Sequence, residues 1–535
     1  MNFEHFSIPF SQIRHLSKTD KNYVTASDDL REFYKYPVHI DSFKQVIEDK
    51  QRQGVDRELL SRVFHTQYAM LEPTAYINNQ INALKNENTF TVTTAHQPCL
   101  FTGPLYFIYK IVSTINLAED LKKHYSDYHF VPVFVIGGED HDFEEINHVH
   151  LYNKTLTWDN GGQFGAVGEM KASTLDKVLS ELKEMVGTSD HATTIYELIE
   201  KSYTGAATFG MATQVLLNAL FAERGLLILN MNDRDLKRRF IPVMQDELEN
   251  EHAHKFVGET QAALANAGYH PQAFSRNINL FYLKDQLRER IIREENGDFK
   301  INNTDLVFSQ SAMLQQVKNN PEYFSPNVIL RPLYQETILP NLAYIGGGGE
   351  IAYWLERKSL FEFYQINFPM LIRRNSLLWL DKQTMNKMQK SGLSVHDLFE
   401  KPLDLAQTIL LRQAKVAFNL EPEIEKLGQI FKDIALKAFQ VDPTLEKYAM
   451  AECTKLLKGI ESVEDRLRKT EKQKHETLLN QVANIQQKLF PNDGLQERTD
   501  NFIPYYIKYG PAWLEVLIEY LHPLGSGFDI IIEKE

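Results

Sequence analysis

The most constraining feature of the sequence is a strand–loop–helix–strand pattern in its first third. The run TFTVTTA (89–95) is rich in β-branched residues, which predicts a strand. After it, PLYFIYKIVSTINLAEDLKKH (104–124) has the composition of a helix, and FVPVFVIGG (130–138) predicts a second, buried strand. Units of this kind build parallel sheets with right-handed crossovers, so the sequence predicts an α/β fold.

Two polar segments follow these strands. HQPCLFTGP (96–104) comes after the first strand, and GGEDHDFEEINH (137–148) overlaps the end of the second. In open parallel sheets, ligands bind beyond the carboxyl ends of the strands. We therefore expect the two segments to be neighbours in space and to face one small molecule.

The remaining sheet elements are widely spaced. Further strands are predicted at 225–230, 327–332, 341–345 and 368–374. The stretches of about 150–222 and 235–325 are expected to be insertions, helical in places, between sheet elements. Residues Gly346 to Gly349 form a glycine loop that opens another helix.

From about residue 385 the pattern becomes helical. One amphipathic helix covers 421–440, and a second could run from Pro443 to Phe490, roughly 70 Å, with an apolar seam that becomes irregular near Lys474. We expect an antiparallel coiled-coil arm; two shorter helices broken near Gly459 are the alternative. The expected domains are a core of residues 1–384, a coiled-coil domain of residues 385–500 and a segment of residues 501–535 that returns to the core.

Composition narrows the setting. The formal net charge of −13 argues against a general coating of nucleic acid, although it leaves a local basic groove open. Two cysteines, Cys99 and Cys453, cannot build a disulfide framework, which suits a reducing cytosol. The N-terminus lacks the apolar region of a signal peptide, and no apolar run reaches the length of a membrane span. We expect a cytoplasmic protein without a membrane or nucleic-acid partner.

The acidic segment after the second strand has two non-metal interpretations. Asp140, His141 and Asp142 would sit at the end of a buried strand, where a histidine flanked by carboxylates can shuttle protons near neutral pH. Alternatively, Glu144 and Glu145 begin a helix, whose dipole favours negative charge in the first turn.

A metal site is the third interpretation of the same segment. Glu145-x-x-His148 has the spacing found on the helices of di-iron bundles, and Glu251-x-x-His254 repeats it. A bundle fits poorly with a segment that follows a strand ending in glycines. The sequence therefore requires no metal.

The segment after the first strand is placed to meet an anion. His96 precedes a helix N-terminus, where backbone amides and the helix dipole favour a phosphate or carboxylate. Thr102 is expected to cap that helix, with Pro104 in its first turn. Cys99 is interpreted as a packed thiol, because no base is assigned to it.

Four separated motifs give the chain a family resemblance. They are TAHQPCLFTGPLYFIYKI, FVIGGEDHDFEEINHV, NVILRPLYQETILPNLAYIGGGGEIAYW and LFPNDGLQER, which together span about residues 90–500. With them the chain resembles the bacillithiol biosynthesis cysteine-adding enzyme family. The resemblance implies a Rossmann-like core with connecting-peptide insertions, a helical coiled-coil arm and a homodimer. The first strand, which ends at a histidine-bearing loop, is also similar to that of class I aminoacyl-tRNA synthetases.

The resemblance also implies a reaction. The family adds L-cysteine to glucosaminyl-malate in the last step of bacillithiol biosynthesis, by forming an amide between the cysteine carboxyl and the sugar amine. A carboxylate does not acylate an amine unaided, so ATP or another nucleotide is a candidate activator. Two loops depart from the family pattern: Cys99 stands where glycine is common, and Gly348 replaces a proline.

Roles for individual residues are expected on this basis. His96, Gln97 and the backbone amides of Thr102 and Gly103 are expected to bind the anionic part of a nucleotide or activated carboxyl. The cluster of Asp140, His141 and Asp142 is expected to orient or deprotonate the sugar amine, supported by His148. The opposite wall is expected to consist of Gly346, Gly347, Gly348, Gly349 and Glu350. Arg331 is either a partner for the malate carboxylates or half of a structural ion pair.

Two rival functions remain open at the level of sequence. One is a nucleotide-dependent ligase or nucleotidyltransferase acting on another amine. The other is a non-catalytic coiled-coil scaffold whose sheet merely binds a nucleotide. Polar loops at predicted strand ends favour an enzyme over a scaffold.

Overall fold

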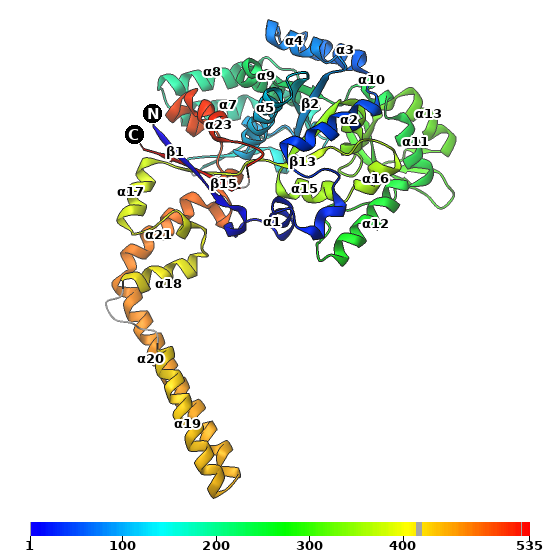
Figure 1. Cartoon of the computed structure of the whole chain (residues 1–535). Coiled ribbons are helices and arrows are strands. Elements are labelled where there is room, and N and C mark those ends of the chain that lie inside the picture. The colour runs from blue at the N-terminus through cyan, green and yellow to red at the C-terminus, as the bar shows by residue number, and fades with distance from the viewer. Residues whose placement is uncertain (1, 153, 414–419, 526, 535) are drawn as a thin grey trace. The chain divides into compact units, whose positions relative to one another are not determined.

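The computed structural model describes residues 2–152, 154–413, 420–525 and 527–534 (Figure 1). The chain divides into two compact units. The larger unit comprises His5–Leu378 and Gln496–Ile530, and the smaller comprises Met1–Glu4, Trp379–Leu495 and Ile531–Glu535.

A five-stranded parallel sheet forms the centre of the larger unit. Its order is β13 (Met370–Arg373), β12 (Asn341–Gly346), β2 (Thr89–His96), β3 (His129–Ile136) and β6 (Leu227–Asn230). This confirms the predicted α/β class with a Rossmann-like sheet. In the register of β2 and β3, His96 pairs with Ile136, so the two polar segments start at the same edge of the sheet.

The crossover between β2 and β3 is the predicted helix, α5 (Tyr106–His124), which is largely buried. Its N-cap is Leu105 rather than Thr102, so the predicted capping role of Thr102 is wrong. Thr102 instead ends a short 3-10 turn (Leu100–Thr102) with φ 69°, because the chain reverses there before entering the helix.

Helices surround the sheet in the larger unit (Figure 1). They include α1 (Lys18–Val24), α2 (Phe43–Gln53), α3 (Arg57–Tyr68), α4 (Ala75–Ala83), α14 (Arg331–Ile338), α15 (Gly348–Leu355), α16 (Lys358–Phe363), α22 (Ile503–Tyr509) and α23 (Ala512–Tyr520). Three more strands, β1 (Phe3–Pro9), β14 (Leu377–Leu380) and β15 (Gly527–Glu533), contain three of the four points where the chain passes between the units. Within the described residues, no helix has the length and hydropathy needed to span a membrane.

The first insertion separates β3 from β6. It contains α6 (Phe143–Ile146), the hairpin of β4 (His148–Leu151) and β5 (Lys154–Thr157), and the helices α7 (Asp176–Val186), α8 (Asp190–Thr204) and α9 (Phe209–Phe221). Helices therefore make up most of its regular structure, as the sequence indicates.

The second insertion separates β6 from β12. Its helices are α10 (Arg234–Arg238), α11 (Ile241–Asn250), α12 (His252–Asn266) and α13 (Gln310–Asn319). It also contains an antiparallel sheet, in the order β10 (Val307–Phe308), β9 (Phe299–Ile301), β8 (Leu287–Arg293), β7 (Leu280–Lys284) and β11 (Phe324–Pro326). This sheet was not predicted from the sequence.

One predicted strand is wrong. Residues 327–332 form a turn and the start of α14 instead of a strand. The Asn327 side chain accepts a hydrogen bond from the backbone amide of Ile329 at 2.8 Å, which closes a tight turn. Pro332 then lies in the first turn of α14, where its missing N–H costs little.

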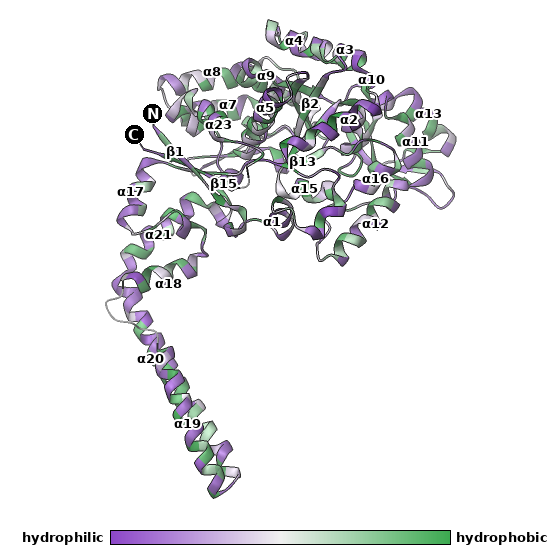
Figure 2. Ribbon diagram, in the orientation of Figure 1, coloured by the Kyte–Doolittle hydropathy of each residue, from purple (hydrophilic) through white to green (hydrophobic). Residues whose placement is uncertain are grey.

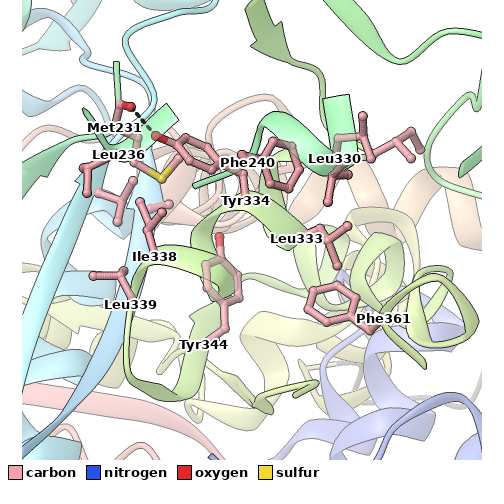
Figure 3. Close-up of a cluster of buried hydrophobic side chains, with 14 of the residues drawn as sticks. Met231, Leu236, Phe240, Leu330, Leu333, Tyr334, Ile338, Leu339, Tyr344 and Phe361 are labelled. Atoms are coloured by element: carbon pink, nitrogen blue, oxygen red, sulfur yellow. Dashed lines mark hydrogen bonds between the residues drawn. The ribbon is translucent and has the colours of Figure 1, made fainter. Parts of the chain in front are cut away.

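A large hydrophobic core holds α14 between the sheet and the neighbouring helices (Figure 3). Leu333, Tyr334 and Ile338 of α14 are buried, and the Tyr334 hydroxyl donates a hydrogen bond to the Met231 carbonyl at 2.8 Å. Removing such side chains from water supplies most of the stabilisation that positions the strand ends.

The smaller unit is mainly helical. Its helices are α17 (Lys382–Lys390), α18 (Pro402–Gln413), α19 (Glu421–Val441), α20 (Thr444–Lys474) and α21 (Glu476–Leu489). The helices α19 and α20 run antiparallel as the predicted coiled-coil arm, with hydrophilic and hydrophobic residues alternating along both (Figures 1 and 2).

The second arm helix is interrupted at His475. With φ −107° and ψ 16°, His475 leaves the helical conformation and separates α20 from α21. The helix is therefore neither continuous to Phe490 nor broken near Gly459, which lies inside α20. The break coincides with the irregularity of the apolar seam near Lys474, where the packed face of the helix must shift.

Candidate functional site

A cavity of about 480 Å³ opens at the carboxyl ends of the central strands. His96 and Gln97 contribute from the end of β2, Asp140 from the loop after β3, and Glu350 from the loop after β12. The structure thus brings together polar segments that lie far apart in the sequence.

His96 is held as a neutral imidazole. Its Nδ1 lies 3.0 Å from the Gln97 carbonyl, to which it can only donate, so Nε2 accepts from the Tyr106 hydroxyl at 3.1 Å. Burial, reinforced by the nearby positive charge of Lys110, lowers the pKa of His96 to about 4. Burial also raises the pKa of Tyr106, so this hydroxyl keeps the proton that it donates.

Asp140 is held as a carboxylate. Gln97 Nε2 donates to its Oδ2 at 2.7 Å, and Arg288 Nη1 donates to its Oδ1 at 3.2 Å. Burial would raise the pKa of Asp140, but hydrogen bonds from His141 and the charge of Arg288 hold it well below its usual range. Such a weak base orients an amine better than it deprotonates one.

The rest of the predicted acidic cluster points elsewhere. His141 and Asp142 are exposed, and neither belongs to the described residues that line the cavity. His141 Nδ1 accepts from Arg288 Nη1 at 2.6 Å, so this ring helps to fix Arg288. The structure therefore places Asp140 in the cavity lining and His141 and Asp142 outside it.

Glu350 holds the glycine loop in shape. It pairs with Lys110 Nζ at 2.8 Å and accepts hydrogen bonds from the Tyr344 hydroxyl and the Gly347 amide, each at 2.8 Å. Burial would raise its pKa, but Lys110 and the Gly347 amide lower the pKa of Glu350 to about 2. The carboxylate is consequently ionised and already satisfied by protein groups.

Three of the four loop glycines reach the cavity. Gly347, Gly348 and Gly349 line it, whereas Gly346 belongs to the end of β12 and is absent from the described lining. A Cβ on Gly346 would lie 3.1 Å from the Tyr344 ring, which explains a small residue there without a contact to ligand.

Arg331 presents an unsatisfied donor. Its Nη1 donates to Gln335 Oε1 at 3.0 Å, while its buried Nη2 has no hydrogen-bond partner. None of the described carboxylates forms an ion pair with Arg331, so the structural ion pair considered from the sequence is not seen. A buried, unpartnered guanidinium nitrogen at a cavity wall fits an anionic ligand group.

The loop after β2 contributes less than predicted. The Thr102 amide donates to the Cys99 carbonyl at 3.0 Å, and the Gly103 amide donates to the Leu100 carbonyl at 2.8 Å. Both amides are used within the turn, so the predicted anion binding by Thr102 and Gly103 is wrong. Burial raises the pKa of Cys99 to about 12, which keeps it a thiol, as expected for a packed side chain.

A second cavity, of about 320 Å³, contains two of the remaining predicted residues, Gly103 and His148. Five residues line both cavities: His96, Gln97, Tyr106, Glu145 and Arg498. Among the described residues, no group of three or more His, Cys, Asp or Glu side chains is arranged to hold a metal ion.

Comparison with known proteins identifies the family. A family model described as "Bacillithiol biosynthesis BshC, N-terminal Rossmann-like domain" matches residues 1–375, and one described as "Bacillithiol biosynthesis BshC, C-terminal coiled-coil domain" matches residues 377–533. The chain belongs to the BshC family. Its members share the two-part organisation seen here, a Rossmann-like domain followed by a coiled-coil domain.

Curated relatives match over nearly the whole chain. "Putative cysteine ligase BshC" of Flavobacterium psychrophilum is 40% identical and covers 98% of each chain. The protein of the same name from Flavobacterium johnsoniae is 41% identical over 98% of this chain and 99% of its own. A solved structure titled a putative arginyl-tRNA synthetase from Campylobacter jejuni aligns with a TM-score of only 0.23 and 10% identity, covering 83% of this chain and 97% of that one.

Several cavity residues of this BshC-family chain were missed from the sequence. They are Tyr106, Glu139, Arg288, Arg374 and Arg498. The rule that sites lie at strand ends could have found Arg374, which directly follows β13. Arg288 could not be found in that way, because it reaches the cavity from β8 of the second insertion.

The cavity is rich in charges of both signs. The lining cations are Arg288, Arg331, Arg374 and Arg498, and the lining anions are Glu139, Asp140, Glu145 and Glu350. Arg374 and Arg498 both lie near the ring of Tyr106, with their guanidinium carbons 5.3 and 5.8 Å from its centroid. Such a lining suits a ligand that carries both carboxylates and an amine.

Proposed function

We propose that this chain is a ligase that joins the carboxyl group of L-cysteine to the amine of glucosaminyl-malate, forming an amide in the last step of bacillithiol biosynthesis. Membership of the BshC family and relatives named as cysteine ligases support a ligase of bacillithiol biosynthesis. The main support for these two substrates and for the amide bond is the cavity at the strand ends. It places arginines and carboxylates around a neutral histidine.

The larger cavity is proposed to bind glucosaminyl-malate. The unpartnered Nη2 of Arg331 provides a donor for one malate carboxylate, since guanidinium and carboxylate groups match in geometry. Asp140 remains ionised and is proposed to accept a hydrogen bond from the sugar amine, which orients its lone pair toward the incoming carboxyl carbon. His96 is neutral and is held in place by the Tyr106 hydroxyl. We propose that its ring contacts the sugar amine and the cysteine carboxyl group.

Amide formation from a free carboxylate releases an oxygen that is a poor leaving group. A nucleotide such as ATP would supply the activation by converting this oxygen into part of a phosphate leaving group. The cavity has room for nucleotide phosphates, because Gly347 to Gly349 carry no side chains. The buried Nη2 of Arg331, which has no hydrogen-bond partner, can donate to a phosphate oxygen. Arg331 thus binds either the malate or the nucleotide. An Arg331→Lys variant distinguishes the two roles, because KM should rise for glucosaminyl-malate in the first case and for the nucleotide in the second.

The proposal is tested in cells and with purified protein. Cells lacking the protein should accumulate glucosaminyl-malate and lose its cysteinyl product, as measured by mass spectrometry of labelled thiols and amines. The purified chain should form the amide from the two substrates only when a nucleoside triphosphate is present. Unchanged thiols in the deletion strain would contradict the proposed function.

A further inference from the structure

The second cavity adjoins the first across a common wall. Its own lining comes from the Cys99–Pro104 loop, from β4 and from Thr499. The common wall includes His96 and Tyr106, whose side chains are hydrogen-bonded to each other at 3.1 Å. Two ligands, one in each cavity, would therefore lie next to each other at these shared residues, which also include Gln97, Glu145 and Arg498.

We propose that this second cavity of about 320 Å³ is the subsite for the free amino acid substrate, L-cysteine, bound as a zwitterion. The inference rests on the proposed function and deepens it by dividing the two substrates between two cavities. The larger substrate, a sugar bearing a dicarboxylate, takes the 480 Å³ cavity, and the smaller takes the 320 Å³ cavity.

The charged groups of the second cavity match an α-amino acid. Glu145 and Arg498 are the acidic and the basic side chain in its lining, and among the described residues neither forms an ion pair. The Arg498 guanidinium can hold the α-carboxylate through two parallel hydrogen bonds. Glu145 can hold the α-ammonium group, and burial together with the charges of Asp142 and Asp140 raises the pKa of Glu145, so a neighbouring cation is favoured there.

The walls away from these charges suit a thiol side chain. Val149 of β4 and Cys99 are almost fully buried, and with Gly103 and Pro104 they form the less polar part of a lining that also contains His148, His150 and Thr499. Sulfur is polarizable and packs well against such an apolar part. Arg498 lines both cavities, so a carboxyl group bound by Arg498 would lie where the two cavities adjoin.

The subsite is tested with a pair of matched substitutions. Val149 lines only the second cavity, and Val328 lines only the first, so phenylalanine at each position fills one cavity. Val149→Phe should raise KM for L-cysteine at least about tenfold while KM for glucosaminyl-malate changes less than about twofold. Val328→Phe should show the opposite pattern. If Val149→Phe raised KM for both substrates equally, or changed KM for neither, the assignment of the second cavity to L-cysteine would be wrong.

A second measurement covers the case in which Val149→Phe does not fold, as judged by circular dichroism. Isothermal titration calorimetry on the full chain should show that L-cysteine binds at least about tenfold more tightly than 3-mercaptopropionate, which lacks the ammonium group. Glu145→Gln should remove that preference. Arg498→Gln should likewise remove the preference for L-cysteine over cysteamine, which lacks the carboxylate. Preferences that persist in both variants would overturn the subsite.

The binding assay also separates this inference from the proposed function. If the wild-type chain binds L-cysteine with these preferences but forms no amide, the subsite stands and the proposed reaction fails. If the amide forms while Val149, Glu145 and Arg498 variants leave the cysteine parameters unchanged, the reaction stands and the subsite fails.

Discussion

Single residues determine the shape of the candidate site where the packing is too tight to accept an additional side-chain atom. Gly348 is the clearest example, because a Cβ there would lie 2.9 Å from Cβ of Asp20. Asp20 cannot swing aside easily, since Arg373 holds both of its carboxylate oxygens at 3.2 Å in a buried ion pair. The close approach of α1 to the glycine loop therefore depends on the absence of a side chain at position 348.

Gly348→Ala should consequently destabilise the fold by about 1–3 kcal/mol and lower turnover, because the added methyl group overpacks a site that cannot relax. The matched control is Gly349→Ala, since a Cβ at Gly349 meets nothing within 4 Å. Thermal unfolding of both variants checks the effect on stability; turnover is compared between Gly348→Ala and wild type, because Gly349 itself lines the cavity. Equal effects of the two substitutions would contradict the role assigned to Asp20.

The partly buried His96 makes stability depend on pH. Because burial lowers its pKa from 6.5 to about 4, the unfolded chain binds a proton at pH 5 that the folded chain does not. Stability is thus lost as pH falls from 6.5 toward 4. The wild type should lose about 2 kcal/mol more than His96→Gln between pH 7 and pH 5, measured by urea denaturation. Parallel pH profiles for the two proteins would show that folding does not lower the pKa of His96.

At the scale of elements, the turn before α14 decides where Arg331 points. Asn327 closes this turn through Ile329, and its Nδ2 also donates to Asn279 Oδ1 at 2.9 Å. The turn replaces the strand expected from the sequence, and α14 begins directly after it at Arg331. Side-chain acceptors at such positions compensate for the free amides of a helix start.

Asn327→Ala should therefore cost about 1 kcal/mol of stability and weaken anion binding by Arg331. Asn327→Asp is the matched control for stability, because it keeps the acceptor for the Ile329 amide and loses the donor to Asn279. Denaturant unfolding should rank the aspartate variant closer to wild type; KM for glucosaminyl-malate is compared only between wild type and Asn327→Ala, because an aspartate adds a negative charge to the cavity lining. An aspartate variant as impaired as the alanine variant would shift the role to the Asn279 contact.

At the scale of the whole molecule, the arm carries apolar side chains that its own two helices leave exposed. On α19, Leu436 is 64% and Val441 82% exposed, and on α20 Tyr448 is 65% exposed. Figure 2 shows hydrophobic residues along the length of both helices. We propose that a second copy of the chain covers this surface, which gives a homodimer through the coiled coil.

Leu436→Glu should accordingly shift the protein toward the monomer by placing a charge in an apolar contact. Lys437→Glu is the control, because it adds the same side chain at the next, polar position of α19. Analytical ultracentrifugation over a range of concentrations measures both. A wild-type chain that sediments as a monomer at all concentrations would exclude the proposed dimer.

Periodic patterns of the sequence by themselves determined the parallel sheet, its crossover helix and the helical hairpin, because periodicity reports local burial. They also indicated that His96, Gln97 and Asp140 lie together, since strand ends of a parallel sheet share one edge. Tertiary structure alone decided that Arg288 reaches Asp140 across 148 residues of sequence and that Asp20 packs on Gly348. These contacts depend on how separate elements dock, and docking is governed by the shape of packed surfaces, which no local pattern encodes.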